Sequence, residues 1–360
     1  MTTLFLSPMD VWLFRDGRPF DAGSIHRAES MFPPYPSVIQ GALRTHQLTI
    51  KNVDVNDKAA VVATVGDVNY LKGLTVRGPF VAKKQGKEIT LYFSQPSDSV
   101  VSIGKNIETE EDEFWLTPAS RQAQPDTLKT SQTLSLLGFR DEGGKQIESL
   151  WLDNDSLQKY LNNQSVRATK AGELFLREQR VGIGMNPERV VKDGMLYEAE
   201  FIRPKENIGL VVDMSYADSE WSQPGVLHIG GERRMAYFEQ ATISLPTANP
   251  KIKKSAGFKV YFATPAFFNE GWKPATWSKF FDGLKEDDLL AAAVNRYETI
   301  GGFDWSADSN HENAHRPARR FVPAGSVYYF KNSGNVSLKT ESITDYGAEI
   351  GFGQIIIKEW

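Results

Sequence analysis

The sequence predicts a mixed α and β protein with two globular domains. Its length of 360 residues indicates two domains, because domains average about 100–200 residues. Hydrophobic residues make up 41% of the chain and include 21 Phe, 12 Tyr and 8 Trp, which excludes disorder as the main state. The elements also recur in a similar order, because strand and helix patterns at the start of the chain are followed by a second such series after residue 250.

The first elements are a strand and a capped helix separated by a long loop. The segment Thr3–Phe14 is dense in Leu, Phe, Val and Trp and predicts a long strand with a bend at Pro8. The prolines in Phe32–Pro36 require extended backbone. Ser37 is then the predicted N-cap of a helix over Val38–Leu48, whose apolar positions share one face.

The chain continues mainly in β structure. Its acidic run, Glu108–Glu113, lies in a predicted irregular insertion and indicates a solvated surface that repels phosphate. One further helix is predicted, over Trp277–Ala293. Strands are predicted at Leu74–Val81, Glu88–Phe93, Phe175–Ile183, Met195–Arg203, Asn207–Met214, Val226–Ile229, Met235–Leu245, Phe258–Thr264, Val294–Ile300, Ser326–Lys331 and Gly353–Trp360.

A short segment with two prolines, 245–251, is the predicted linker. It divides an N-terminal domain at 1–248 from a C-terminal domain at 256–360. The N-terminal domain contains the irregular insertion, at about 95–170, and a long β-hairpin, at 179–200, with a tip rich in Gly, Asn and Pro. The two halves share no aligned sequence repeat, so their similarity is inferred from element order alone.

The composition excludes several kinds of chemistry. The chain has no Cys, which rules out disulfides, thiolate metal sites and cysteine nucleophiles. His311–His315 has the spacing of a zinc-protease motif, but the flanking Asn310 and Pro317 argue against the helix that would align its ligands. No run approaches the roughly 18 apolar residues of a membrane helix, and the N-terminus lacks a signal-peptide pattern. We therefore expect a cytoplasmic protein with no metal, no cofactor and no membrane partner.

Arginines next to glycines suggest an RNA-binding track. The net charge is −4, so a nucleic-acid surface must be a local patch. Arginine suits phosphate oxygens, and glycine lets backbone approach a phosphate closely. Each arginine could instead pair with a neighbouring acid, such as Asp16 or Glu232. The candidate contacts are Arg15, Arg18, His26, Arg27, Arg44, Arg180, Arg189, Arg233, Arg234, Arg316, Arg319 and Arg320.

Two glycines near the C-terminus, Gly351 and Gly353, have two interpretations. They can supply positive φ in a tight turn, or they can present backbone N–H groups to phosphates. Composition favours neither interpretation, so both glycines are included among the candidate RNA contacts.

Several motifs resemble a known family. The stretches Leu13–Phe20 and Phe32–Thr45 resemble the start of the third subunit of the type III-B (Cmr) CRISPR effector, in the repeat-associated mysterious protein (RAMP) superfamily. The resemblance spans almost the whole chain. It continues through Arg180–Gly184, Gly194–Tyr197, Gly230–Arg234, Gly301–Asp304, Val322–Phe330 and Gly351–Gln354.

This resemblance implies an α+β fold of two ferredoxin-like (RRM-type) domains with antiparallel sheets. It implies a non-catalytic ribonucleoprotein subunit, acting in antiviral defence, that holds the 5′ repeat-derived tag of the CRISPR RNA. The implied protein partners are the large polymerase-like subunit and the backbone RAMP subunit. By position, the hairpin Arg180–Tyr197 is the thumb that wedges into the RNA, with Met185, Asn186 and Arg189 near its tip.

Two other functions remain open at this stage. A metal-independent endoribonuclease that processes CRISPR precursor RNA would use a histidine as general base, and His26 is the best candidate. A protein–protein scaffold without RNA contacts is the third possibility.

Overall fold

The computed structural model describes most of the chain. The described residues are 1–15, 27–67, 71–106, 108–122, 134, 136–138, 149–185, 191–216, 221–246, 251–252, 257–303, 315–332 and 334–359. They form two compact units that interleave along the sequence. Unit 1 comprises Met1–Ile89, Leu174–Ile243 and Thr299–Arg319, and unit 2 comprises Thr90–Glu173, Ser244–Glu298 and Arg320–Trp360. These units do not coincide with the ranges 1–248 and 256–360, which remain a prediction of domain limits.

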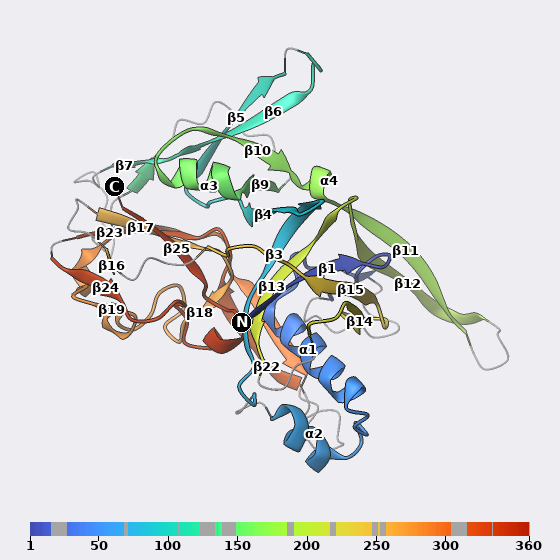
Figure 1. Cartoon of the computed structure of the whole chain (residues 1–360). Coiled ribbons are helices and arrows are strands. Elements are labelled where there is room, and N and C mark those ends of the chain that lie inside the picture. Colours follow the sequence, from blue (N-terminus) through green and yellow to red (C-terminus); the bar gives the residue numbers. More distant parts are fainter. Residues whose placement is uncertain are drawn as a thin grey trace. The chain divides into compact units, whose positions relative to one another are not determined.

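Unit 1 contains an antiparallel sheet with the lateral order β14-β15-β1-β13-β3 (Figure 1). Strand β1 pairs on both sides, and its residues Leu4, Phe5 and Leu6 are buried. The predicted strand over Thr3–Phe14 therefore ends earlier, at the proline where a bend was expected. The strand bounds are β1 Thr2–Pro8, β3 Thr75–Gln85, β13 Ile208–Ser215, β14 Gly225–His228 and β15 Met235–Gln240.

Two helices follow β1, namely α1 (Pro36–Ile50) and α2 (Lys58–Val65). Helix α1 packs against β3 and β14 and buries its apolar face. The predicted N-cap Ser37 is wrong, because Tyr35 occupies that position in extended backbone without a side-chain cap bond. The fixed φ of Pro36 suits the first turn of a helix, which accounts for the earlier start.

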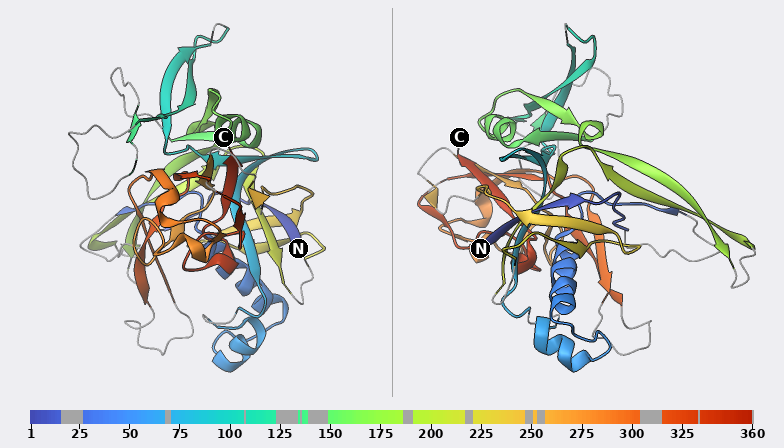
Figure 2. Two further views of the ribbon diagram at one scale, coloured as in Figure 1. Left: turned by 90° about the vertical axis from the view of Figure 1, so that its left-hand side faces the viewer. Right: turned by 45° about the vertical axis from the view of Figure 1, so that its right-hand side comes forward.

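The predicted long hairpin is present in unit 1 as β11 (Phe175–Met185) and β12 (Val191–Pro204). The paired strands β11 and β12 run out from the sheet of unit 1 (Figures 1 and 2). The short strand β2 (Arg27–Ala28) pairs in parallel with β12 at Glu198 and Ala199.

Unit 2 begins within β4 (Glu88–Ser94) and includes a sheet with the order β4-β9-β10-β6-β5. The expectation of an irregular insertion over 95–170 is wrong for its described part, which contains four strands of this sheet and a helix. The alternation was hard to recognise because β5 is exposed or half-buried along its whole length. The bounds are β5 Ser99–Lys105, β6 Asp112–Pro118, β9 Leu150–Asp153, β10 Val166–Lys170, α3 Asn154–Leu161 and α4 Ala171–Leu174.

A second sheet of unit 2 has the order β20-β23-β17-β25. Its strands are β17 Gly257–Phe262, β20 Leu289–Ala293, β23 Val327–Lys331 and β25 Ile355–Glu359. Short strands complete the described structure: β7 Ser120–Gln122, β8 Leu136–Gly138, β16 Lys251–Ile252, β18 Ala266–Phe267, β19 Phe281–Asp282, β21 Glu298–Phe303, β22 His315–Val322 and β24 Val336–Leu338.

The helix predicted over Trp277–Ala293 is wrong. The segment instead forms two 3₁₀ turns, Trp277–Lys279 and Glu286–Asp288, together with β19 and β20. Gly283 lies between them with φ 77°, and a Cβ there would be 2.2 Å from the carbonyl oxygen of Asn335. This left-handed residue and its close contact prevent a continuous helix.

The main sheets of the two units share one strand order. In unit 1 the first to fourth strands along the chain are β1, β3, β13 and β15. Across the sheet they lie in the order fourth, first, third, second. The strands of the second sheet of unit 2, which are β17, β20, β23 and β25 along the chain, lie across their sheet in the same order. An α-helix between the first and second strands occurs in the described part of unit 1 alone. The α+β class with antiparallel sheets is confirmed, whereas the description as two ferredoxin-like domains is not. Within the described residues, no helix is long and apolar enough to cross a membrane.

A buried carboxylate joins distant segments of unit 2. Asp98 is 3% exposed and accepts hydrogen bonds from the hydroxyls of Tyr160, at 2.8 Å, and Tyr329. The hydroxyl of the neighbouring Tyr261 donates to the carbonyl oxygen of Ser94 at 2.6 Å. Burial, together with the Asp98 charge, raises the pKa of Tyr160 far above its ordinary value. The cluster therefore connects the segment 90–173 to strands β17 and β23.

We expect Asp98→Ala to destabilise unit 2 by about 2–6 kcal/mol, because two buried hydroxyls would lose their acceptor at a cost of about 1–3 kcal/mol each. Urea unfolding measures the loss. The matched control is Asp98→Ala in a Tyr160→Phe/Tyr329→Phe background, where the loss should be much smaller. An equal loss in both backgrounds would show that the two hydroxyls do not contribute.

Burial of His46 on α1 predicts a pH-dependent stability for unit 1. The His46 ring lies 4.8 Å from Trp221 and 5.2 Å from Phe238, and burial lowers its pKa. A lowered folded-state pKa means that stability is lost as the pH falls through the unfolded-state value of about 6.5. We expect His46→Phe to show a smaller loss of unfolding free energy between pH 7.5 and pH 5 than the parent protein. Identical pH profiles would contradict this assignment.

Candidate nucleic-acid interface

Four segments that are distant in sequence meet in unit 1 where the hairpin joins the sheet. We call this place the hairpin base and define it by residues 10–15, 27–30, 177–180 with 198–203, and 230–234. It contains Arg15, Arg27, Arg180, Arg233 and Arg234 from the predicted RNA contacts. The structure thus brings five of the candidate residues to one part of unit 1.

Backbone hydrogen bonds fix the hairpin base. The N–H of Trp12 donates to the carbonyl oxygen of Ile202, and the N–H of Ile202 donates back to that of Trp12, both at 2.8 Å. Arg15 forms an isolated antiparallel bridge with Ser30. The N–H of Gly231 donates to the carbonyl oxygen of Leu13 at 2.8 Å. Main-chain pairing therefore sets the position of the arginines.

An apolar cluster lies within the hairpin base. Its members are Val11, Leu13, Ala28, Ala199 and Phe201. The turn 230–234 packs closely on this cluster because Gly230, with φ 76°, has no side chain. A Cβ there would be 2.4 Å from the carbonyl oxygen of Leu13. The glycine pair of this motif therefore has a structural role, which is to let the turn that carries two arginines approach Leu13.

A network of charges surrounds Asp10, whose carboxylate interacts with three guanidinium groups. It lies 3.6 Å from Arg180, 3.2 Å from Arg203 and 3.4 Å from Arg234. Glu178 contacts Arg180 at 2.7 Å and Arg203 at 2.5 Å, and these hydrogen bonds, led by that from Arg203, lower the pKa of Glu178. The guanidinium groups of Arg180 and Arg234 also lie 4.8 and 4.7 Å from the ring of Phe201.

Two of the candidate residues, Arg180 and Arg234, therefore pair with acids. This is the alternative that the sequence left open. Arg234 also lies 3.5 Å from Glu232, as that alternative proposed. Arg233 differs from its neighbour, because it is exposed and no described carboxylate forms an ion pair with it. Its φ of 52° places it in the left-handed part of the turn. Arg233 thus presents an uncompensated positive charge beside the Asp10 network.

A second ion pair holds the inner side of the hairpin. Glu200 is 6% exposed and pairs with Arg177. The Nη1 atom of Arg177 also donates to the carbonyl oxygen of Ser30 at 2.7 Å, while the N–H of Ser30 donates to Glu200 at 3.3 Å. This pair connects β11 and β12 to the segment that follows β2.

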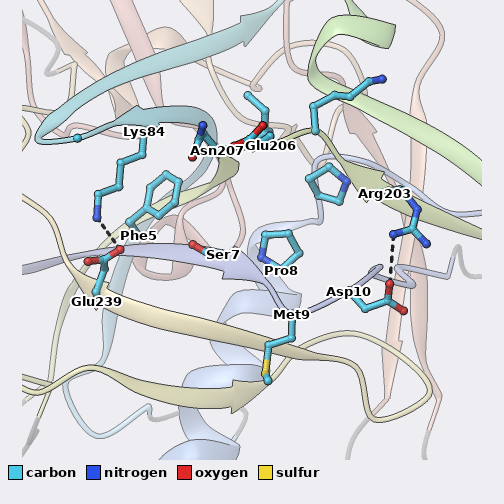
Figure 3. Close-up of a pocket in the computed structure, with 14 residues that line it drawn as sticks. Phe5, Ser7, Pro8, Met9, Asp10, Lys84, Arg203, Glu206, Asn207 and Glu239 are labelled. Atoms are coloured by element: carbon cyan, nitrogen blue, oxygen red, sulfur yellow. Dashed lines mark hydrogen bonds and ion pairs between the residues drawn. The ribbon is translucent and has the colours of Figure 1, made fainter.

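A polar cavity of about 590 Å³ opens next to the Asp10 network (Figure 3). Asp10 and Arg203 form part of its wall, and an ion pair of 2.5 Å between Lys84 and Glu239 forms another part. Phe5 contributes an aromatic surface. Sequence reasoning missed Asp10, Glu178, Arg203 and this cavity, because the Asp10–Arg203 and Asp10–Arg234 contacts span 193 and 224 residues.

Other predicted arginines lie away from the hairpin base. Arg44 on α1 donates from Nη2 to the carbonyl oxygen of Gly66 at 2.6 Å. Arg316, Arg319 and Arg320 lie on β22, where alternation places Arg316 and Arg320 on one face and Arg319 on the other. The guanidinium of Arg320 lies 4.8 Å from the ring of Tyr297. The basic run therefore presents charge on both faces of a strand.

The proposed role of Gly351 and Gly353 as N–H donors to phosphate is wrong. Both residues are buried and have positive φ, at 107° and 69°. The N–H of Gly353 donates to Pro265 at 2.8 Å, and that of Gly351 to Ala348 at 3.3 Å. A Cβ at Gly353 would lie 2.5 Å from the carbonyl oxygen of Ile343. These glycines form a tight internal turn, which was the other interpretation.

Some candidates cannot be placed. Arg18, His26, Asn186 and Arg189 lie outside the described residues, and Arg27 and Met185 are described by their backbone alone. In the β11–β12 hairpin, the described part of β11 ends at Met185 and that of β12 begins at Val191.

Solved structures with similar folds include subunits of CRISPR complexes. One chain, from "Cryo-EM structure of the Type III-B Cmr-beta bound to cognate target RNA and AMPPnP, state 1", has a TM-score of 0.49 and 16% identity, covering 91% of this chain and 86% of that chain. Another, from "Crystal structure of Csm3-Csm4 subcomplex in the type III-A CRISPR-Cas interference complex", has a TM-score of 0.37 and 10% identity, with 100% and 99% coverage. No curated protein matches the sequence.

The family comparison covers nearly the whole chain. A model described as "CRISPR-associated protein (Cas_Cmr3)" matches residues 4–360. This range includes every motif that carried the predicted resemblance, from Leu13–Phe20 to Gly351–Gln354. The chain therefore belongs to the Cas_Cmr3 family of CRISPR-associated proteins, the type III-B (Cmr) subunit family that its motifs predict.

Proposed function

We propose that this type III-B effector subunit binds RNA without cleaving it and holds the 5′ repeat-derived tag of the CRISPR RNA at the hairpin base. In the same proposal it docks the large polymerase-like subunit and the backbone RAMP subunit. The observation that carries the proposal is that the four segments of the hairpin base meet at one place in unit 1 and bring five candidate arginines with them. Membership of the Cas_Cmr3 family supports the same role.

The charge network suits an RNA backbone because its guanidinium groups are already oriented. Asp10 and Glu178 fix the forks of Arg180 and Arg203, and stacking on Phe201 restrains Arg180 and Arg234. Arginine loses less conformational entropy on binding when its planar fork is held in this way. Exposed ion pairs contribute little free energy, so a phosphate can replace a carboxylate as the partner.

The hairpin itself is the proposed thumb. Val181 and Ile183 on β11 are 67% and 46% exposed and lie on one face of the strand. Apolar side chains on a projecting ribbon suit insertion beside an unstacked base, and the neighbouring arginines suit the adjacent phosphates. The shared strand order of the main sheets supports two ferredoxin-like frameworks beneath these features.

The RNA-binding proposal predicts a specific loss in Arg233→Ala. Since Arg233 is exposed and has no described ion-pair partner, its removal should abolish about one phosphate contact. The slope of log affinity against log salt should then fall by about 0.7, the value for one contact to a single strand. Fluorescence anisotropy with a labelled tag RNA at several salt concentrations measures this slope.

Arg167→Ala is the matched control, because Arg167 is also exposed but lies on β10 in unit 2 and pairs with Glu113 at 3.5 Å. Its slope should equal that of the parent protein. Equal slopes for Arg233→Ala and the parent, with the fold intact, would argue against the hairpin base as the RNA site.

The endoribonuclease alternative predicts that the chain cleaves repeat RNA, whereas the proposed function predicts no cleavage. It requires a general base such as His26, which lies outside the described residues. We expect the purified chain to leave labelled repeat RNA intact in EDTA over hours. Discrete cuts that disappear in His26→Ala would replace the non-catalytic proposal with a nuclease.

A further inference from the structure

A second hairpin, in unit 2, has a surface unlike that of β11–β12. It consists of β5 and β6, joined through residues 106–111, and it extends from its sheet in every view (Figures 1 and 2). Nothing in the RNA-binding proposal uses this hairpin, although its register is regular over seven residue pairs, from Ser99 with Pro118 to Lys105 with Asp112. Its end is therefore an exposed feature whose role is unassigned.

The tip of this hairpin is strongly acidic. Residues 99–118 contain five acids and one Lys, a net charge of −4. The whole chain also has a net charge of −4, so all other residues together are neutral. Four of these acids are exposed, and none has an ion-pair partner among the described residues: Glu108, Glu110, Glu111 and Asp112.

Hydrogen bonds hold the described residues of the tip. The side-chain oxygen of Asn106 accepts hydrogen bonds from the N–H groups of Glu108 and Thr109 at 2.9 and 3.1 Å. The N–H of Asn106 donates to the carbonyl oxygen of Glu111 at 2.9 Å. Glu113 is held by Asn106 at 2.7 Å and by Arg167. These hydrogen bonds thus hold the described residues around the four exposed carboxylates.

Large apolar side chains are exposed on both faces of the ribbon behind the tip. Ile103, opposite Phe114, is 50% exposed, and Trp115, opposite Ser102, is 38% exposed. Alternation along the strands places Ile103 and Trp115 on opposite faces. The indole lies against Gly104, where a Cβ would be 3.7 Å from its Nε1 atom. Exposed aromatic and aliphatic groups next to a polar rim are typical of protein interfaces.

We propose that the tip of β5–β6 inserts into a groove on another protein subunit, and that this groove has a floor rich in Lys and Arg and apolar walls. Charge complementarity selects this occupant, since unpaired carboxylates at the end of the ribbon match basic side chains and repel phosphate groups. A groove also accounts for apolar groups on both faces, because a flat partner surface would cover only one of them. The inference rests on the proposed function in one respect, namely that the partner belongs to the same effector.

The experiment uses the effector reconstituted from this chain, its purified cognate subunits and the CRISPR RNA. A photo-crosslinking residue, Ile103→p-benzoylphenylalanine or Trp115→p-benzoylphenylalanine, replaces one apolar side chain at a time. We expect both positions to crosslink to the same protein subunit, at a segment rich in Lys and Arg. Crosslinks to RNA, to a second copy of this chain or to nothing would each overturn the proposal.

Charge reversal tests the electrostatic part. The variant E108K/E110K/E111K/D112K should weaken binding of that subunit at least about tenfold at 0.1 M salt, because it places like charges against the basic groove. The control E88K/E270K/D287K/E349K changes the net charge equally at four other exposed acids and should leave binding unchanged. Equal losses in the two variants, or no loss in either, would contradict the groove.

The two proposals fail in different ways. The isolated charge-reversed chain should bind tag RNA at least as tightly as the parent chain, since it loses no candidate RNA contact. Absence of tag binding by the parent chain would overturn the proposed function while leaving the crosslinking result valid. Intact tag binding without a crosslinked subunit would overturn the docking proposal alone.

Discussion

The pairing of Trp12 with Ile202 determines the geometry of the hairpin base. Its two hydrogen bonds attach β12 to the chain that leaves β1, which is the central strand of the unit 1 sheet. The remaining contacts of the hairpin base depend on this attachment, because Asp10 reaches Arg180 and Arg203 only when the root of the hairpin lies beside it. A hairpin joined to the sheet solely through its own connection could rotate about that point. Backbone pairing fixes its direction, so the exposed ribbon begins from a rigid root.

Paired arginines and RNA binding are compatible at this site. A guanidinium that is free in solution pays conformational entropy when it binds a phosphate, whereas Arg180 and Arg234 are already restrained by Asp10 and by the ring of Phe201. The acids also make the paired part of the network nearly neutral, so in the proposed function attraction of RNA depends on additional cations such as Arg233. The hairpin base thus combines pre-organised donors with a small excess of charge.

Local sequence patterns predicted the strands of the unit 1 sheet and the long hairpin, because alternation and turn residues act over a few neighbours. They failed where distant contacts decide the structure. The segment Trp277–Ala293 has an apolar pattern compatible with a helix, but Gly283 lies against Asn335 in a left-handed conformation. Neighbouring glycines marked Arg180 and Arg234 as candidate residues. No sequence pattern around Asp10 indicates that its carboxylate pairs with both of them. The Gly351–Gly353 turn was ambiguous for the same reason, since its buried N–H partners include Pro265.

The distribution of charge makes a net acidic chain compatible with the proposed RNA-binding role. Because the β5–β6 hairpin alone has the full net charge of −4, the other residues contain equal numbers of acidic and basic side chains. At physiological ionic strength the field of the exposed carboxylates decays over about 8–10 Å, so it acts on what lies against the tip. The overall sign of the protein is therefore a poor guide to its partners. In both proposals the local excess of charge decides the partner. Arg233, which has no ion-pair partner among the described residues, lies beside an oriented arginine network and favours phosphate. The four exposed acids of the β5–β6 tip, also without a described ion-pair partner, lie near exposed Ile103 and Trp115 and favour a basic protein surface.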